Sequence, residues 1–398
     1  MADPFRPRFL TPSILREIGK PGLFRVLEPY LEWFASQGLK IRSERDLDDE
    51  ALDRLSLVVM AGTDLPSGLP EMLVLLGDVS RAEMHDRLVA LAGRAKLKAD
   101  AKDPTADLAV RIFLKARNLL EDLHVELASL RPRRICRYLA VKKAIPAVPK
   151  DWKKRCTLVE QSLHKDFDNR FRGTGTKVHP FPEDGGFRLM IRRGDTIRSQ
   201  AVIGDDNESR RLVLRPELYD VVRYDTRHGD LLINARAQAD VRAYCHYIGL
   251  HIFGNQALFD SFEPPPRYSL EPIRAIGEAV LDRGTFEEID EVSLVTLDLV
   301  HPALDHVEVR LGPDDVFTAL QLVGNRIDDS AVMKRAKFGF KLGGEKRTRS
   351  VVIEPPIKAT YEHDDAAEAI ERFLEDRKFL MPRTESLDAV SQTLFAVS

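Results

Sequence analysis

Residues 187–203 read FRLMIRRGDTIRSQAVI, and this stretch marks the point where the sequence changes from helical to strand patterns. Its two apolar runs, Phe187–Ile191 and Thr196–Ile203, flank Arg193-Gly194-Asp195, which is typical of a β-hairpin. Further strand-like runs follow at 212–214, 220–224, 231–233, 291–299, 306–311, 338–342 and 348–353. Because strands mostly follow strands, the sequence predicts a mixed, mainly antiparallel sheet with flanking helices.

Helical patterns dominate the part that precedes this stretch, from residue 11 to about 130. Apolar residues between Leu23 and Phe34 recur at helical spacing, and Pro29 is expected to kink that helix. Ser80–Glu83 has the spacing of a capping box at a helix start. Short loops between such helices favour a bundle. The predicted fold class is therefore α+β, with an N-terminal helical bundle followed by the sheet domain.

Three segments are expected along the 398 residues. A helical domain covers 1–130, a basic linker covers 131–150, and an α+β domain covers 151–398, with a sub-boundary near 265–285 left open. The third segment begins with a long amphipathic helix from Asp151, whose apolar residues are spaced by three or four. The division follows from the change in periodicity and from the Arg, Lys and Pro residues of the linker.

The composition is that of an ordinary globular protein, with 43% hydrophobic and 31% charged residues and a net charge of −3. Cys136, Cys156 and Cys245 form no CxxC pair, so a zinc or redox motif is not indicated. No run approaches the roughly 18 apolar residues of a membrane span, and no signal peptide is recognisable. These features predict a cytoplasmic protein with no membrane partner.

The sequence contains no GxxxxGK[ST], GxGxxG, HExxH or GxSxG motif. We therefore expect no cofactor and no metal site, and the leading interpretation is non-enzymatic, although activity is left open. One enzymatic alternative is a metal-dependent nuclease using Asp220, Asp225 or Asp230, because carboxylates on adjacent strands can hold magnesium. The competing interpretation of these aspartates is an ordinary hairpin turn.

Positive charge is unevenly placed along the chain. Between Arg131 and Lys177 there are fourteen basic and four acidic residues, so this segment carries +10 and the rest of the chain carries −13. Lys153, Lys154 and Arg155 lie in the first turn of the helix that follows Asp151. The positive end of the helix dipole disfavours cations there by roughly 0.3–1 kcal/mol each. An anion docking at the helix start would reverse that effect.

A second basic cluster lies in the predicted hairpin over 338–353. Phe338, Phe340 and Leu342 alternate with Lys337 and Lys341, which leaves the lysines on one face of the strand. A basic two-stranded ribbon can follow a phosphate backbone or enter a major groove. The alternative interpretation is an edge hairpin that lysines protect against aggregation.

Together the two clusters support the leading hypothesis, a non-enzymatic accessory protein that binds the backbone of DNA or RNA without reading base sequence. The expected contact residues are Arg133, Arg134, Arg137, Lys142, Lys143, Lys153, Lys154, Arg155, Arg170, Arg172, Lys177, Lys337, Lys341, Arg347 and Arg349. A rival hypothesis is an adaptor without nucleic acid, in which the acidic remainder pairs with a second copy or with a basic partner. A small-ligand sensor is a weaker alternative.

The central third of the chain resembles a group of known sequences. The segments YDVVRYD at 219–225, GDLLINA at 229–235 and YSLEP at 268–272, with Ile248-Gly249 and Phe253-Gly254, resemble uncharacterised bacterial proteins of similar length. Such proteins are associated with mobile elements or anti-phage defence. The resemblance implies a bacterial origin and a place in a multi-protein assembly that processes nucleic acid. It carries no catalytic residues over to this sequence.

Overall fold

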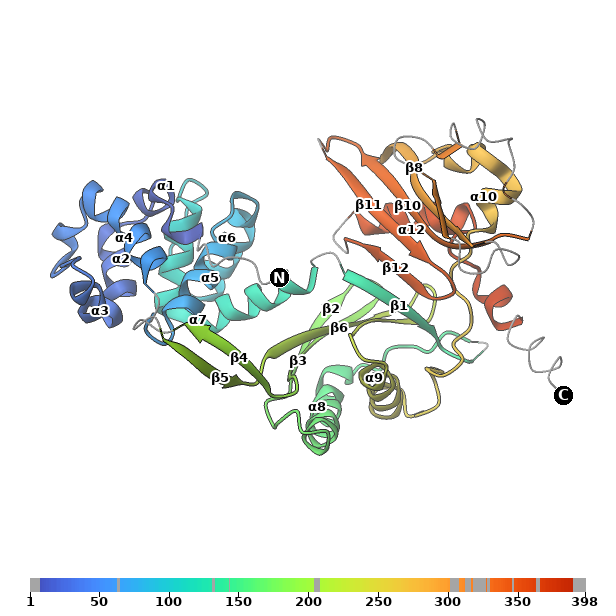
Figure 1. The fold of residues 1–398 in the computed structure, drawn as a ribbon, viewed down its shortest axis with the longest axis horizontal. Helices are drawn as coiled ribbons and strands as arrows, with labels where there is room; N and C mark the ends of the chain where they lie inside the picture. The colour runs from blue at the N-terminus through green and yellow to red at the C-terminus, as the bar shows by residue number, and fades with distance from the viewer. Residues whose placement is uncertain are drawn as a thin grey trace. The chain divides into compact units, whose positions relative to one another are not determined.

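Two units make up the computed structural model of the chain (Figure 1). Unit 1 comprises Met1–Ala128 and Ser199–Val213, and unit 2 comprises Ser129–Arg198 and Leu214–Ser398. The structure describes residues 8–62, 65–130, 133–142, 144–203, 208–300, 308–311, 316–317, 327, 330–345, 347–362 and 366–388, with only the backbone described at 129, 130, 133 and 308–311.

Unit 1 is mainly helical. Its helices are α1 (Pro12–Arg16), α2 (Lys20–Leu27), α3 (Leu31–Ser36), α4 (Asp49–Ala61), α5 (Leu69–Val79), α6 (His85–Arg94) and α7 (Thr105–Leu130), with the 3-10 turns η1 (Arg8–Leu10), η2 (Glu28–Tyr30), η3 (Glu44–Asp46) and η4 (Ala82–Met84). Their apolar faces form one core, which includes fully buried Phe9, Phe34 and Leu73. The predicted N-terminal helical bundle is confirmed.

Two local predictions in unit 1 had different outcomes. The helical run between Leu23 and Phe34 is interrupted at Pro29, where η2 separates α2 from α3, as predicted. The capping box at Ser80 was wrong, because Ser80 is the C-cap of α5 rather than the start of the next helix. The apolar face of α5 continues to Val79, and its burial in the core outweighs the preference of serine for an N-cap.

A small two-stranded sheet completes unit 1. It consists of β4 (Arg198–Ile203) and β5 (Ser209–Leu214), and nearly all of its described side chains are exposed or half-buried. The predicted hairpin through Arg193-Gly194-Asp195 was wrong, because β3 (Gly186–Gly194) pairs with other strands and not with β4. β3 is buried along almost its whole length, so it occupies the interior of a larger sheet.

Unit 2 is built on a ten-stranded sheet in which every neighbouring pair is antiparallel. The strand order is β2-β3-β6-β7-β1-β12-β11-β10-β8-β9. The remaining bounds are β1 (Arg133–Leu139), β2 (Lys177–Glu183), β6 (Glu217–Asp225), β7 (Asp230–Asn234), β8 (Ile289–Val300), β9 (Glu308–Leu311), β10 (Val332–Leu342), β11 (Thr348–Glu354) and β12 (Lys358–Tyr361). The α+β fold class is confirmed.

Helices pack on both faces of this sheet (Figure 1). On the face that carries Tyr138, here called the α9 face, α8 (Trp152–Asn169) and α9 (Gln238–His251) cover β1, β3, β6 and β7. On the opposite face, called the α12 face, α12 (Ala367–Asp376), α10 (Glu271–Ile276) and η5 (Gly277–Leu281) pack against β8, β10, β11 and β12. Strand alternation assigns each side chain to one face.

The segment 131–150, predicted as a basic linker, contains strand β1, so that prediction was wrong for its first half. β1 lies between β7 and β12, near the middle of the sheet. Ile135, Arg137 and Leu139 are buried on one side of the strand and Tyr138 on the other. This alternation was not recognised in the sequence, because the residue type does not show whether an arginine is buried or exposed.

The predicted hairpin of β10 and β11 is present, but it is not a free ribbon. β10 also pairs with β8, and β11 pairs with β12, so the hairpin lies inside the sheet. Neither a ribbon inserted into a groove nor an edge hairpin protected by lysines describes it.

The sheet also runs without a break across the possible sub-boundary near 265–285. In the described part of the chain, no helix combines the length and apolarity of a bilayer span.

Candidate nucleic-acid interface

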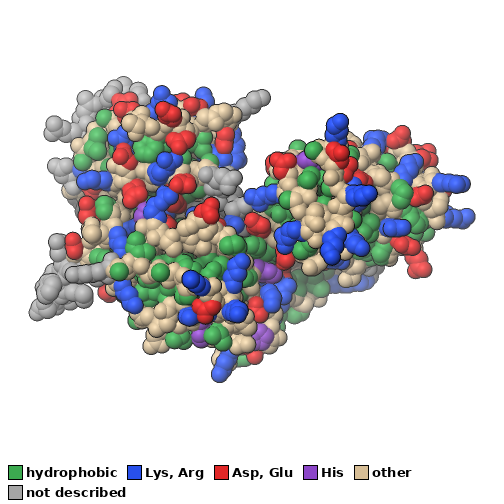
Figure 2. Space-filling view, turned by 180° about the vertical axis from the view of Figure 1, so that it is seen from behind, with side chains coloured by type: hydrophobic (Ala, Val, Ile, Leu, Met, Phe, Trp, Pro, Cys, Tyr) green, Lys and Arg blue, Asp and Glu red, His purple; other side chains and the backbone are tan. Residues whose placement is uncertain are grey.

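The predicted contact residues fall into several different environments. Exposed cations are Lys142, Lys153, Lys154 and Lys341, and Lys337 is half-buried. Arg134, Arg155, Lys177 and Arg347 form ion pairs at the surface, while Arg137, Arg170, Arg172 and Arg349 are held in partly or fully buried ion pairs. Lys143 and the side chain of Arg133 lie outside the described residues. Figure 2 shows acidic and basic side chains interspersed on the side that it displays.

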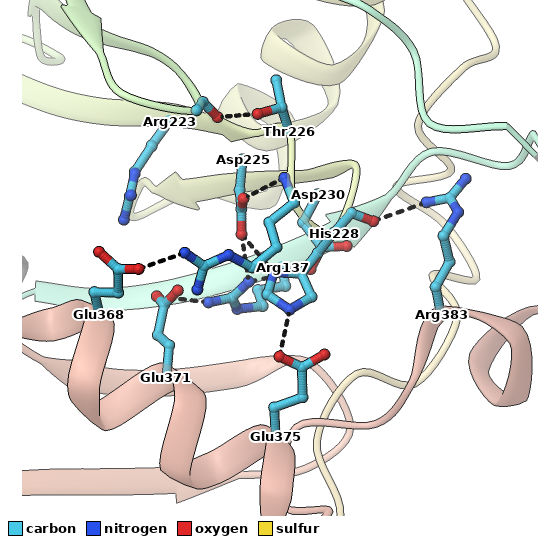
Figure 3. Close-up of polar contacts among 12 residues, drawn as sticks. Arg137, Arg223, Asp225, Thr226, His228, Asp230, Glu368, Glu371, Glu375 and Arg383 are labelled. Atoms are coloured by element: carbon cyan, nitrogen blue, oxygen red, sulfur yellow. Dashed lines mark hydrogen bonds and ion pairs between the residues drawn. The ribbon is translucent and has the colours of Figure 1, made fainter. Parts of the chain in front are cut away.

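Arg137 is the clearest correction to the predicted set. Its side chain is 0% exposed and donates to Asp230 Oδ2 at 3.1 Å and Glu371 Oε1 at 2.7 Å (Figure 3). It also donates to Tyr268 Oη at 2.8 Å. A guanidinium buried on the α12 face among carboxylates cannot reach a phosphate in solution. Arg137 instead joins β1 to β7 and α12.

The same buried network contains a histidine–aspartate pair in the β6–β7 turn. His228 Nδ1 lies 2.6 Å from Asp225 Oδ2, and His228 Nε2 lies 3.3 Å from Glu375 (Figure 3). Burial acts to raise the pKa of Asp225, but the His228 hydrogen bond and the Arg137 charge outweigh it and hold that pKa below its usual value. Burial acts to lower the pKa of His228, and the bond to Asp225 outweighs it, so that pKa is raised.

A second cluster fixes Arg170 and Arg172 on the α9 face. Asp240, at the start of α9 and 0% exposed, accepts from Arg170 at 2.7 Å, Arg172 at 2.8 Å and Arg193 at 2.8 Å. Arg193 also donates to Asp220 at 2.6 Å. These contacts tie the end of α8 and strand β3 to α9. They account for the two arginines by structure, without a ligand.

The three aspartates of the nuclease alternative are not brought together. Asp225 and Asp230 are register partners on the α12 face, whereas Asp220 lies on the α9 face and accepts from Arg193 and Tyr244. Burial raises the pKa of Asp220. Among the described residues there is no cluster of three or more His, Cys, Asp or Glu side chains that could hold a metal ion. The nuclease alternative gains no support from this geometry.

At the turn of the β10–β11 hairpin, two further predicted arginines form ion pairs. Arg349 is 9% exposed and donates to Glu345 at 2.5 Å and to Glu362 at 3.2 Å. Arg347 is exposed and pairs with Glu362 as well. At the start of α8, Arg155 donates to Asp151 at 2.9 Å, one helical turn away. This i,i+4 pair offsets the unfavourable position of Arg155 in the first turn.

The remaining cations include a set that the sheet brings onto one face. The register places Arg134 opposite Thr360, Thr360 opposite Val352, and Val352 opposite Lys337. Directly paired residues point to the same side of a sheet, so Arg134 and Lys337 share the α9 face. The two basic clusters of the sequence therefore meet in one cross-strand row, about 200 residues apart in the chain.

Neighbouring rows add three more cations to this face. Cys136 is opposite Lys358, Lys358 is opposite Glu354, and Glu354 Oε1 lies 3.8 Å from Arg335 Nε. Lys341 lies four residues beyond Lys337 on the same strand. We call the set the polar sheet face; its cations are Arg134, Arg335, Lys337, Lys341 and Lys358, and its carboxylates are Glu291, Asp298 and Glu354.

The polar sheet face is accessible to solvent. The side chains of Arg134 and Arg335 are 56% and 42% exposed, Lys341 is exposed, and Lys337 and Lys358 are half-buried. Sequence reasoning selected Arg134, Lys337 and Lys341 but missed Arg335 and Lys358. For Lys358 the missing signal was the pairing of β12 with β1, which local periodicity does not contain. Alternation after Pro355-Pro356 was the available indication of a short strand.

Comparison with known proteins adds no family assignment to this geometry. No protein-family model matches the sequence, and a search of curated proteins finds none with significant similarity.

Proposed function

We propose that unit 2 binds nucleic acid through its phosphate backbone, on the polar sheet face, as a non-enzymatic accessory protein. The observation that carries this proposal is the cross-strand row that joins Arg134 to Lys337. It brings one member of each basic cluster onto the same exposed surface. The arginines held in buried ion pairs are not available to a phosphate, so the proposed surface is smaller than the sequence suggested.

The dimensions of this surface suit several successive phosphates. Strands lie about 4.8 Å apart, so the three strand spacings between Arg134 and Lys337 amount to roughly 14 Å. Lys341 extends the surface along β10 by about 13 Å, at about 3.3 Å per residue. A duplex rises about 3.4 Å per base pair along its axis, so 14 Å corresponds to roughly four base pairs of axial length. No set of side chains for reading base edges is evident, so binding is expected to be independent of sequence.

Carboxylates on the same surface set a limit on affinity. Glu354 lies 3.4 Å from Arg134 and 3.8 Å from Arg335, so each arginine already has an acidic neighbour. A phosphate must compete with Glu354 for these guanidinium groups. Lys337 and Lys341, which carry no such short contact to Glu354, are therefore expected to make the larger contribution.

The test is a fluorescence anisotropy titration of the full chain with a labelled duplex over a range of salt concentrations. If about five phosphates are contacted, log K falls with a slope of about −4.5 against log salt, a loss of about 500-fold between 50 and 200 mM. The double variant Lys337→Glu/Lys341→Glu should remove most of this binding. A matched control is Lys150→Glu/Lys165→Glu, because both lysines are exposed and lie outside the polar sheet face.

Two results would remove the proposal. One is the absence of salt-sensitive binding to any nucleic acid, and the other is equal affinity of the sheet-face variant and the control. Reversal of Lys153 and Lys154 tests the helix start separately, since both are exposed at the first turn of α8.

The adaptor without nucleic acid stays a prediction. The feature that would carry it is the β4–β5 sheet, where Ile203 and Val213 are 74% and 65% exposed.

A further inference from the structure

A cavity of about 440 Å³ opens beside the polar sheet face, on the α9 face of unit 2. Its walls come from β1, β6, β7, β12 and the start of α9, and they include Arg134, Cys136, Asp220, Arg236 and Lys358. This volume is within the ordinary range for a site that encloses a small organic ligand. Nothing in the proposed function requires such a cavity.

Three cations from three separate segments line this space. Arg134 comes from β1, Lys358 from the paired position next to Cys136 on β12, and Arg236 from the segment between β7 and α9. Arg134 is fixed through its own backbone, because its carbonyl accepts from Asn234 Nδ2 at 2.7 Å. Arg236 is exposed, so its guanidinium is free to turn toward a ligand without unfolding the site.

The acidic and ionisable groups in the wall add little negative charge. Asp220 is 4% exposed and already accepts from Arg193 at 2.6 Å and from Tyr244 at 2.6 Å. Burial raises the pKa of the Cys136 thiol, which keeps it in its neutral form despite the nearby cations. Asp220, the only carboxylate that lines the cavity among the described residues, is therefore compensated. Glu354 lies outside the lining but 3.4 Å from Arg134, so a ligand must compete with it for that guanidinium, whereas Arg236 is the cation of the set farthest from Glu354 in the sheet order.

The start of α9 adds a partial positive charge at the same place. Ala237 is its N-cap residue and, having a methyl side chain, supplies no capping hydrogen bond to the first turn. The one acidic residue of that turn, Asp240, is engaged by three arginines. The first turn of this 14-residue helix, which contributes Gln238 and Val241 to the lining, thus adds its partial positive charge beside a cavity that cations already line.

We propose that this cavity binds a phosphomonoester, a group that carries two negative charges near neutral pH. Three cations in the lining and a helix start favour such a dianion over the single charge of a phosphodiester. The group can come from a free mononucleotide or from the 5′-phosphorylated end of a nucleic-acid strand. The proposal goes beyond backbone binding on the polar sheet face, because it concerns a terminal phosphate in a cavity rather than phosphates along a surface.

The first experiment is calorimetric titration of the full chain with AMP, with adenosine as the control that lacks the phosphate. AMP is expected to bind at least 10-fold more tightly than adenosine. Arg236→Ala is expected to weaken AMP binding at least 10-fold, and Arg236→Lys to restore part of it. Because Arg236 is exposed, an unchanged melting temperature is expected and would show that the loss is not due to unfolding.

The second experiment separates the two sources of the phosphate. A single-stranded oligonucleotide with a 5′-phosphate is compared with the same strand ending in a 5′-hydroxyl, using the wild type, Arg236→Ala and Lys337→Glu/Lys341→Glu. A preference for the 5′-phosphate that Arg236→Ala removes assigns the cavity to a strand end. AMP binding without that preference assigns it to a free nucleotide.

The outcomes also distinguish this proposal from the function proposed above. Retained AMP binding in Lys337→Glu/Lys341→Glu, with lost duplex binding, supports both. Retained AMP binding in a chain that binds no duplex at any salt concentration supports the cavity and removes the backbone function. Equal affinity for AMP and adenosine, together with no preference for a 5′-phosphate, overturns the cavity proposal.

Discussion

Replacement of Arg137 by methionine is the sharpest test of how unit 2 is held together. The side chain is completely buried, and its removal takes away hydrogen bonds to Tyr268, Asp230 and Glu371. Removing one partner of a buried ion pair typically costs about 3–5 kcal/mol, because a buried charge loses its compensation. Asp230 keeps its ion pair with Arg267 at 3.1 Å, so Glu371 is the carboxylate that loses most of its charge compensation.

The expected fall in melting temperature is roughly 6–20 °C, at 2–4 °C per kcal/mol for a unit of this size. The assay is urea or thermal unfolding followed by the fluorescence of Trp152, which is buried and stacks on Phe187 at 4.8 Å. Trp33, the other of the two tryptophans, belongs to unit 1. It is replaced by phenylalanine in all variants, so that the fluorescence emission reports on unit 2.

Two controls accompany this measurement. Arg134→Met, three positions earlier on the same strand, removes a largely exposed arginine and should cost less than about 1 kcal/mol. The deficit of Arg137→Met should also shrink as pH falls, because uncompensated Glu371 then binds a proton more readily in the folded than in the unfolded state. A loss below about 1 kcal/mol for Arg137→Met, or a deficit that grows at low pH, would refute the reasoning.

Three further predictions concern other parts of unit 2. The pKa of His228 is raised in the folded state, so its bond to Asp225 stabilises the protein fully below the unfolded pKa near 6.5, and this contribution is lost as pH rises through the folded pKa. The unfolding free energies of the wild type and of His228→Asn should therefore converge at high pH. A difference that stays constant with pH would contradict this. Asp240→Asn should cost about 3–5 kcal/mol in urea unfolding, because three arginines lose their shared carboxylate, whereas exposed Asp168→Asn should change little. Glu354→Gln should strengthen duplex binding a few-fold and steepen the salt slope by about 0.9, and weaker binding would exclude Arg134 and Arg335 from the interface.

The sequence predicted the fold class because both of its signals are local. Helical spacing in unit 1, the apolar runs of β3 and β6, and the alternation in β10 and β11 are visible within about ten residues. β1 was missed for a physical reason: Arg137 is acceptable in the core only because Asp230 and Glu371 lie beside it, 93 and 234 residues further along the chain. Partners at that separation leave no trace in a local pattern.

The candidate interface was predicted only in part for the same reason. Counting charges between Arg131 and Lys177 treated every cation as exposed, but Arg170 and Arg172 are committed to Asp240. The hairpin lysines were assigned to one face correctly, since alternation settles that locally. Their proximity to Arg134 depends on β12 lying between β1 and β11, which only the assembled sheet reveals.

The position of β1 has a consequence for how unit 2 is made in a cell. Its two neighbours are β7, about 95 residues later, and β12, about 225 residues later. At roughly 5–20 residues per second, a ribosome needs on the order of 10–45 s to supply the second neighbour after β1 has been synthesised. Until then one edge of β1 has open backbone groups and can pair with other nascent chains. Shortened products that stop before residue 358 would keep that edge of β1 unpaired, because its partner β12 begins there.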